Sequence, residues 1–466
     1  MSLASAQRPN AEHSDAVQTL PVVWLQQWAA QNSASGVAWL DQVRQKAAAE
    51  LAASGRLPGR KDERWKYFSL QKLESAQPEL GAGLASEAKS SVTQSDAVLL
   101  SDIGGASLQI QIGSELKLSD QVLKSLPAGL SLLSLPQAID DPEISGQMIS
   151  LIEMVNCQGP SRAFEALNTA CLEAALIIHV AAGKDAGRLH LEWLQPAANR
   201  LDNFRIFVLL EEGAQLQLLE TYPSSATTDQ KAQPVFNLLS QIQLAEAARF
   251  DHLRVQSASE FQHLLQFVNV EQASESHYRY TGFEMGGGLV RNDLNCQLNG
   301  PGASTDMAAA FIGNGESCID HHIIADHQAT NCTSEQNFRG VLGDRSKGVF
   351  NGKAFIRPGA DGSKVRQSNA NLLLSDLAEM NTKPELEIYA DEVEASHGAT
   401  VGQLDEQALF YLQTRGIAEA DAQRLLTGAF CRAIGARLTD RQLVEQIEVL
   451  LDAAMPGISE LDGVQS

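Results

Sequence analysis

The sequence predicts a mainly β protein with helical ends, and we expect its core to be a parallel β-helix. From about residue 185 to residue 400, apolar and polar residues alternate with the period of two that a half-buried strand requires. Turn-forming residues interrupt this alternation, so the strands are short and begin at intervals of roughly a dozen residues. Segments of helical composition lie on both sides of the array.

Four stretches show the alternation clearly: Gln215–Leu218, Gln241–Leu244, Leu294–Leu298 and Leu386–Ile388. An isolated stretch of the same kind, Ser107–Ile112, comes earlier in the chain. The residues that favour turns between strands are found at Asn299–Gly302, Gly313–Gly315, Leu342–Asp344, Asn351–Gly352 and Pro358–Gly362.

A β-sandwich, a propeller and a parallel β-helix would all give this pattern. No recurring Trp-Asp or Gly-His pair marks propeller blades. A solenoid needs covered ends to avoid edge-to-edge pairing, and flanking helices can provide such caps. The β-helix is therefore the favoured architecture.

Three regions are expected. Residues 1–155 are predicted to be mostly helical after a mobile start of about 20 residues, and the Ala-, Leu- and Gln-rich composition of residues 22–54 predicts a pair of helices. Residues 156–403 are predicted to form the β-helix core, and residues 404–466 a C-terminal helical domain.

Apolar residues in the C-terminal region recur with helical spacing. One stripe comprises Ala422, Leu425, Leu426, Ala429, Phe430 and Ala433, and a second comprises Leu443, Ile447, Leu450 and Leu451. Such faces are covered either by packing within the chain, which is the commoner case, or by a partner protein.

Composition and charge narrow the function class. The 466 residues include 35 Lys plus Arg against 57 Asp plus Glu, which gives a net charge of −22, and 44% are hydrophobic. This apolar share excludes a wholly disordered chain, and the charge argues against nucleic acids and membranes as partners because no basic patch offsets it. The six cysteines form no CxxC pair, and the N-terminus lacks the order of a signal peptide. We expect a soluble, cytoplasmic protein.

The common catalytic signatures are missing. The sequence contains no GxxxxGK[ST], GxSxG or HExxH motif, so we expect no ATP site in this chain. The glycine cluster Met285–Gly288 lacks a following lysine and is interpreted as a bend.

A histidine-rich stretch, Cys318–Cys332, offers thiolates, imidazoles and carboxylates that metals accept. On a strand, His321 and His322 would point to opposite faces, so the whole stretch cannot serve one site. Histidines held in the interior or lying on the surface are favoured over a metal site.

His397 is a second candidate. It precedes Gly398, which has no Cβ and so allows another backbone or a partner to approach closely. An imidazole there could bind a metal or transfer protons near neutral pH, although a lone histidine is more often structural.

Several segments in fixed order carry a family resemblance. They are Lys347–Ala354, Gln367–Ser375, Thr382–Ile388, Ser396–Gly402 and Tyr411–Ile417, with Leu167–Ala170 and Asp62–Tyr67 upstream. On these segments the sequence resembles the SufB/SufD family of iron-sulfur cluster assembly proteins over most of its length. The Asp62–Tyr67 segment resembles the SufD branch.

The resemblance implies a right-handed parallel β-helix between helical regions, and a non-catalytic scaffold function. It implies that the chain pairs with a SufB-like paralogue and binds a SufC-like ABC ATPase through its C-terminal helices. Leu425, Leu426, Ala429 and Phe430 thereby become candidates for ATPase docking. In isolation, a homodimer is an alternative assembly.

The resemblance also gives His397 a role, because it matches the SufD histidine at the interface with SufB. It is a candidate ligand for iron or for a transient iron-sulfur cluster. Ala395 stands where some relatives carry a cysteine, and Cys296, Cys318 and Cys332 are poor substitutes. A SufB-like role is disfavoured because His397 replaces that branch's essential cysteine. Whether a flavin takes part is left open.

An alternative of another class is a β-helix enzyme that acts on polysaccharides, with Asp391 and Glu392 as acid and base. Adjacent acids on a strand point apart, and 6% aromatic residues provide no evident sugar platform. Only fold analogy supports this alternative.

Overall fold

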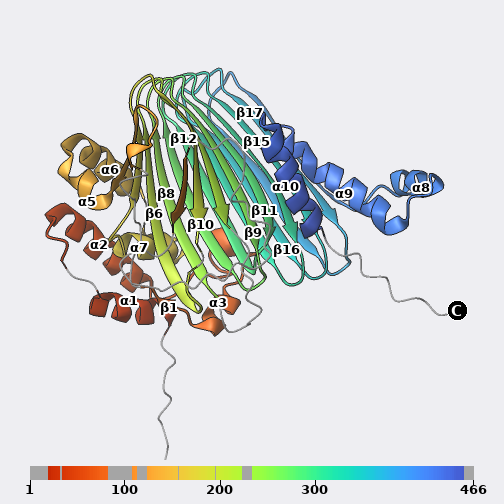
Figure 1. The fold of residues 1–466 in the computed structure, drawn as a ribbon, viewed down its shortest axis with the longest axis horizontal. Coiled ribbons are helices and arrows are strands. Elements are labelled where there is room, and N and C mark those ends of the chain that lie inside the picture. Colours follow the sequence, from red (N-terminus) through yellow and green to blue (C-terminus); the bar gives the residue numbers. More distant parts are fainter. Residues whose placement is uncertain are drawn as a thin grey trace, which may run out of the picture.

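The fold is a parallel β-solenoid with helices near both ends of the chain, which confirms the predicted class (Figure 1). The computed structural model describes residues 19–31, 34–81, 108–112, 123–155, 157–194, 196–222 and 233–455. The start of the chain, predicted to be mobile, lies outside the described residues up to residue 18.

From β4 onward the chain alternates between two sheets: even-numbered strands form one sheet, called the even sheet, and odd-numbered strands form the other, called the odd sheet. The even sheet contains β4 (Leu176–Val180), β6 (Arg200–Leu210), β8 (Val235–Leu244), β10 (His263–Gln272), β12 (Leu289–Leu298), β14 (Cys318–His327), β16 (Lys347–Ile356) and β18 (Glu379–Ile388). The odd sheet contains β5 (Asp185–Trp193), β7 (Gln215–Tyr222), β9 (Arg249–Ala258), β11 (His277–Gly286), β13 (Ser304–Gly313), β15 (Thr333–Leu342), β17 (Lys364–Leu373) and β19 (Glu394–Gly402).

Each of these strands pairs in parallel with the strand two positions further along. Leu289 lies opposite Cys318, and Cys318 lies opposite Lys347, so one coil takes 29 residues there. The predicted spacing of roughly a dozen residues corresponds to one strand and one turn, which is half a coil. Strands β1 (Glu79–Leu80), β2 (Leu108–Ile112) and β3 (Leu130–Ser134) add to the sheets from the N-terminal region, β3 in antiparallel orientation.

Most of the predicted turn clusters lie at strand ends, and the glycines of Met285–Gly288 form the bend between β11 and β12. The assignment of Asn351–Gly352 to a turn was wrong, because both residues lie inside β16. A Cβ at Gly352 would lie 2.6 Å from Gln336 Oε1 and 2.5 Å from the Phe350 ring. Close packing in the interior therefore explains this glycine.

Inward-pointing side chains from the two sheets fill the space between them, and most are apolar. In the middle coils, however, Glu220, His252, Arg254, Tyr280 and Glu284 are also fully buried there. The interior is therefore a mixed core in which charged groups need partners.

N-terminal helices cover the outer face of the even sheet (Figure 1). They are α1 (Leu20–Gln31), α2 (Ala38–Ser54), η1 (Glu63–Trp65), α3 (Gln71–Ala76), α5 (Leu135–Asp140), α6 (Pro142–Met154), η3 (Pro160–Arg162) and α7 (Ala163–Ala170). Trp24, Trp65 and Phe164 pack with Leu265 and Phe267 of β10, so the predicted helical pair α1–α2 belongs to a cap on this sheet.

The C-terminal region contains α8 (Glu406–Thr414), α9 (Glu419–Gly435) and α10 (Arg441–Ala454). Helices α9 and α10 cover part of the odd sheet, and α8 packs against α9. Leu443, Ile447, Leu450 and Leu451 of α10 are buried against apolar residues of the odd strands, which confirms the second predicted stripe as a packing face.

Candidate functional site at the open end of the solenoid

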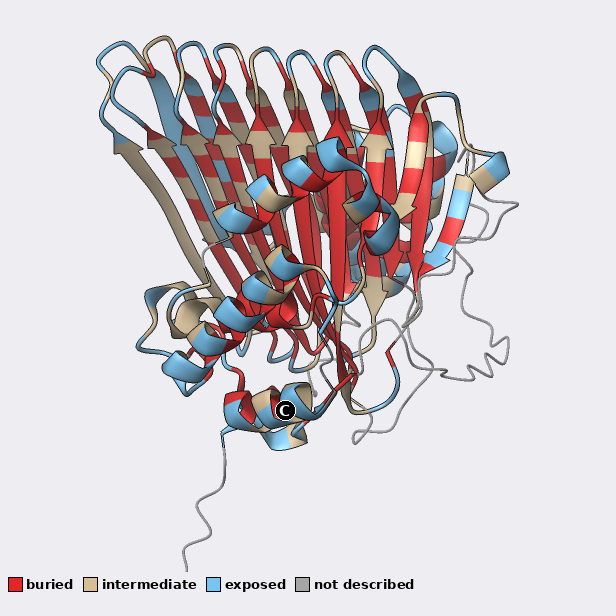
Figure 2. Ribbon diagram, turned by 90° about the vertical axis from the view of Figure 1, so that its left-hand side faces the viewer, coloured by how far each residue is buried: buried red, intermediate tan, exposed pale blue. Residues whose placement is uncertain are grey.

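The solenoid ends at β18 and β19, which are the terminal strands of the two sheets. Strand β18 pairs with β16 and strand β19 pairs with β17, so among the described residues the other edge of each strand has no strand partner for its backbone groups. All nine residues of β19 are exposed, whereas strands of the middle coils are mostly buried (Figure 2). Strand β18 contains Pro384, which suits a terminal strand. Proline has no backbone N–H and so cannot donate a hydrogen bond to a neighbouring strand.

His397 lies at the mouth between the two sheets. His397 lies opposite Gln367 of β17 in the register of the sheet. The residues two positions before and two positions after His397 lie opposite Val365 and Asn369. Val365, Gln367 and Asn369 are all buried and point inward, so His397 occupies the inward face of β19. Because no coil covers this face, the imidazole is exposed.

The neighbours of His397 supply no thiol. Ala395 is two residues away, and burial raises the pKa of Cys296 and of Cys318 to about 12. Cys332 is also buried, with a raised pKa. A Cβ added to Gly398 would meet nothing within 4 Å, so no contact within the described chain explains that glycine.

The histidine-rich stretch divides between two faces of β14, as predicted. His321 is buried inside, where its ring lies 5.0 Å from Phe311 and 5.1 Å from Phe338, and burial lowers its pKa to about 3. His322 points to the other side and contacts Asp320 at 3.2 Å. Among the residues that the structure describes, no three His, Cys, Asp or Glu side chains are grouped to hold a metal ion.

The first C-terminal stripe is split by the tertiary structure. The buried residues of α9 are Ala422, Thr427, Gly428, Cys431, Ile434 and Gly435. Leu425 and Ala429 are exposed, and Leu426 and Phe430 are half-buried. Phe430 lies 5.0 Å from the guanidinium of Arg339 on β15. Helix α9 therefore packs on the sheet by one face and leaves part of its apolar stripe free.

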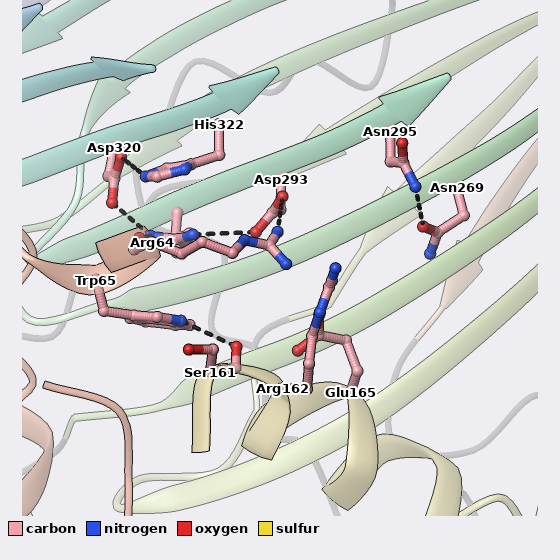
Figure 3. Close-up of polar contacts among 11 residues, drawn as sticks. Arg64, Trp65, Ser161, Arg162, Glu165, Asn269, Asp293, Asn295, Asp320 and His322 are labelled. Atoms are coloured by element: carbon pink, nitrogen blue, oxygen red, sulfur yellow. Dashed lines mark hydrogen bonds and ion pairs between the residues drawn. The ribbon is translucent and has the colours of Figure 1, made fainter. Parts of the chain in front are cut away.

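The Asp62–Tyr67 segment is anchored on the outer face of the even sheet (Figure 3). Arg64 contacts Asp293 at 2.6 Å, and Arg291 contacts Asp293 at 3.0 Å and Asp320 at 2.6 Å. The Arg291 guanidinium lies 4.0 Å from the centre of the Trp65 ring. Burial raises the pKa of Asp293, but Arg64 and Arg291 outweigh it and hold that pKa well below its ordinary value.

The carboxylates proposed for a polysaccharide-acting enzyme lie in the exposed turn between β18 and β19. The backbone N–H groups of Asp391 and Glu392 both donate to Asp361 Oδ1, at 3.2 and 3.4 Å. A groove of about 1420 Å³ runs between the Arg60–Ala76 segment and the even sheet, and neither carboxylate lines it. The structure gives this alternative no acid–base pair around a cleft.

Comparison with known proteins decides the family. Residues 194–430, more than half of the chain, match the model of the SUF system FeS cluster assembly SufBD core domain. The chain belongs to the SufBD family. It is 27% identical over 446 residues to the iron-sulfur cluster assembly protein SufD of Escherichia coli, covering 93% of this chain and 97% of the relative. It is 29% identical over 424 residues to an iron-sulfur cluster assembly SufBD family protein of Synechocystis, covering 84% and 86%.

The matched core of this SufBD protein runs from the residue after β5 into α9 and includes His397. It excludes the Asp62–Tyr67 anchor and helix α10. No helix among the described residues is long and apolar enough to cross a lipid bilayer.

Sequence reasoning missed the inward-facing glutamines of the last coils, Gln336 and Gln367. Their signal was present, because Gln336, Gln367 and His397 are spaced by 31 and 30 residues, one coil each. Without the register, these spacings could not be distinguished from chance.

Proposed function

We propose that this chain is a non-catalytic scaffold subunit of a SufBCD-type iron-sulfur cluster assembly complex. The observation that carries the proposal is the open end of the solenoid. In the described part of the chain, β18 and β19 each have one edge without a strand partner, and β19 carries the exposed His397. A second solenoid that pairs with these edges would satisfy their backbone groups and bury His397 at the junction. A SufB-like paralogue is the proposed partner, and a second copy of this chain can use the same edges in isolation.

At this junction His397 is the proposed ligand for iron or for a nascent cluster, which is the cargo of the complex. A neutral imidazole binds iron, and thiolates bind it more strongly. Since Cys296, Cys318 and Cys332 of this chain are buried, the thiolate would come from the partner.

The exposed part of α9 is the proposed docking site for a SufC-like ABC ATPase. Leu425 has 49% of its surface exposed, and the adjoining helix α8 exposes Phe410 and Tyr411 at 66% and 57%. Large apolar side chains at this exposure commonly mark a protein interface.

The test of the cluster role is His397→Ala in the reconstituted complex. We expect complex formation to persist and cluster formation, measured by visible absorption and by transfer to an apo-protein acceptor, to be lost. A complex that builds clusters at the normal rate without His397 would contradict the role.

The test of docking is Leu425→Glu, with Val449→Glu on α10 as the matched control. Val449 is similarly exposed, at 55%. We expect the first variant to lose the ATPase in co-purification and the second to keep it. Equal retention by both variants would argue against α9 as the docking helix.

A further inference from the structure

Two glutamines precede His397 at the same position of successive coils. Gln336 on β15 is the register partner of Gln367 on β17, and Gln367 is the register partner of His397 on β19. Both glutamines are buried, with 0% and 2% of their surface exposed. The three side chains therefore form one row on the inward face of the odd sheet and end at its open edge.

The hydrogen bonds in this row have a fixed direction. Gln336 Nε2 donates to the backbone oxygen of Lys353 at 3.3 Å, and Gln367 Nε2 donates to Gln336 Oε1 at 3.2 Å. The Lys353 carbonyl can only accept, so Gln336 must turn its amide nitrogen toward it. Its oxygen then faces Gln367, which must donate in turn. Chemistry thus determines both amide orientations.

The row ends with an acceptor that has no donor. Gln367 Oε1 is buried and has no hydrogen-bond partner in the part of the chain that the structure describes. A buried acceptor without a partner is unfavourable, so a donor is expected next to it. The next side chain in the row is His397.

We propose that one imidazole N–H of His397 donates to Gln367 Oε1, so that the other ring nitrogen presents its lone pair to the open end. A neutral imidazole has one N–H and one lone pair, and the bond made by the first decides where the second points. Gln367 is then a positioning residue for His397, and Gln336 holds Gln367 in the required orientation.

The consequence for iron or cluster binding rests on the proposed function of His397, whereas the hydrogen bond itself does not. Histidine ligands commonly donate their second ring nitrogen to an oxygen acceptor, which fixes the tautomer and the ring orientation. Here the acceptor is the neutral amide oxygen of Gln367, which belongs to the preceding coil.

The experiment measures the tautomer of His397 in the full-length chain. Histidines are labelled with ¹⁵N, the signals of His397 are assigned by their loss in His397→Ala, and the tautomer ratio is read from ring ¹⁵N shifts at a pH where the ring is neutral. Gln367→Met, which has no amide acceptor, is expected to change the ratio by roughly fivefold. Gln336→Met should move it in the same direction by less.

Two controls make the result specific. Ser368→Ala alters the exposed face of the same strand and should leave the ratio unchanged. Thr382→Val removes another buried oxygen, on β18 across the mouth, that has no hydrogen-bond partner among the described residues, and it should also leave the ratio unchanged. An unchanged ratio in folded Gln367→Met would overturn the proposal, as would a change in Thr382→Val instead.

The outcomes separate this inference from the proposed function. If Gln367→Met shifts the tautomer while His397→Ala complexes still build clusters, the row is supported and the cluster role fails. If His397→Ala abolishes clusters while no glutamine variant shifts the tautomer, the cluster role is supported and the row fails.

Discussion

Inside the solenoid, Arg254 Nη2 lies 2.9 Å from Glu220 Oε2, and neither side chain has any exposed surface. The two residues are register partners on β9 and β7, and Arg254 also donates to Gln266 Oε1 of the even sheet at 2.6 Å. Burial raises the pKa of Glu220, but Arg254 and His252 outweigh it and lower that pKa to about 2. A charged pair thus links the two sheets through the core.

Removing one charge of this pair is expected to destabilise the fold strongly. Arg254→Met leaves the buried Glu220 carboxylate without its arginine partner, which should lower the free energy of unfolding by about 3–5 kcal/mol. The double variant Glu220→Gln, Arg254→Met should recover much of that loss. Urea denaturation of the full chain measures both. Arg279→Met is the control, because the half-buried Arg279 keeps 38% of its side-chain surface exposed and lies 3.5 Å from Asp251, and its replacement should cost under about 1 kcal/mol. A similar loss in both single variants would contradict the prediction.

Glu284 makes stability depend on pH. Burial raises the pKa of Glu284 from 4.5 to about 8. Between pH 4.5 and about pH 8, the carboxyl group is therefore neutral in the folded chain and ionised in the unfolded chain. In this window the unfolded chain binds fewer protons, and the Glu284 contribution to stability falls by about 1.4 kcal/mol per pH unit as pH rises. Glu284→Gln abolishes this dependence. Its stability relative to wild type should therefore increase from pH 5 to pH 8, measured by urea denaturation at each pH, and a constant difference would refute the assignment.

The anchor of the N-terminal segment is expected to open when Arg64 is replaced. Arg64→Met leaves Asp293 with Arg291 alone, so amide hydrogen exchange in residues 63–68 should become about tenfold faster. The two arginines lower the pKa of Asp293 in the folded state. The stabilisation from the Asp293 carboxylate is therefore fully present above pH 3.8, the pKa in the unfolded chain, and is lost as the pH falls through the lower pKa of the folded state. Arg60→Met, an exposed neighbour, serves as control and should leave the exchange rate unchanged. Equal exchange in the two variants would count against the anchor.

Replacement by alanine should destabilise the chain at one glycine and leave its stability nearly unchanged at another. Gly352→Ala brings a methyl group within 2.6 Å of Gln336 Oε1 and should lower stability by about 1–3 kcal/mol. Gly398→Ala meets nothing within 4 Å in this chain and should stay within about 0.5 kcal/mol. Thermal or urea unfolding of the isolated chain compares them. If Gly398→Ala then weakens pairing with the proposed SufB-like partner, the glycine serves that proposed interface.

Much of the architecture was predictable from local pattern. Alternating residues such as Gln241–Leu244 became strands of the solenoid, because one inward and one outward face require that pattern. Local pattern failed at Asn351–Gly352, where a turn-like pair lies within a strand, and at α9, where the apolar stripe and the buried face differ. In both cases, packing against other coils overrode the local preference.

The sequence by itself determined the repeated strands, the helical ends, the family and the candidacy of His397, because these depend on residue order within short segments. Only the tertiary structure decided that β18 and β19 are open strands, that His397 lies at the mouth of the solenoid, and that Gln367 is its neighbour. The physical reason is register. Residues about 30 positions apart become neighbours only when hydrogen bonding between successive coils sets which residue faces which, and no local pattern encodes that alignment.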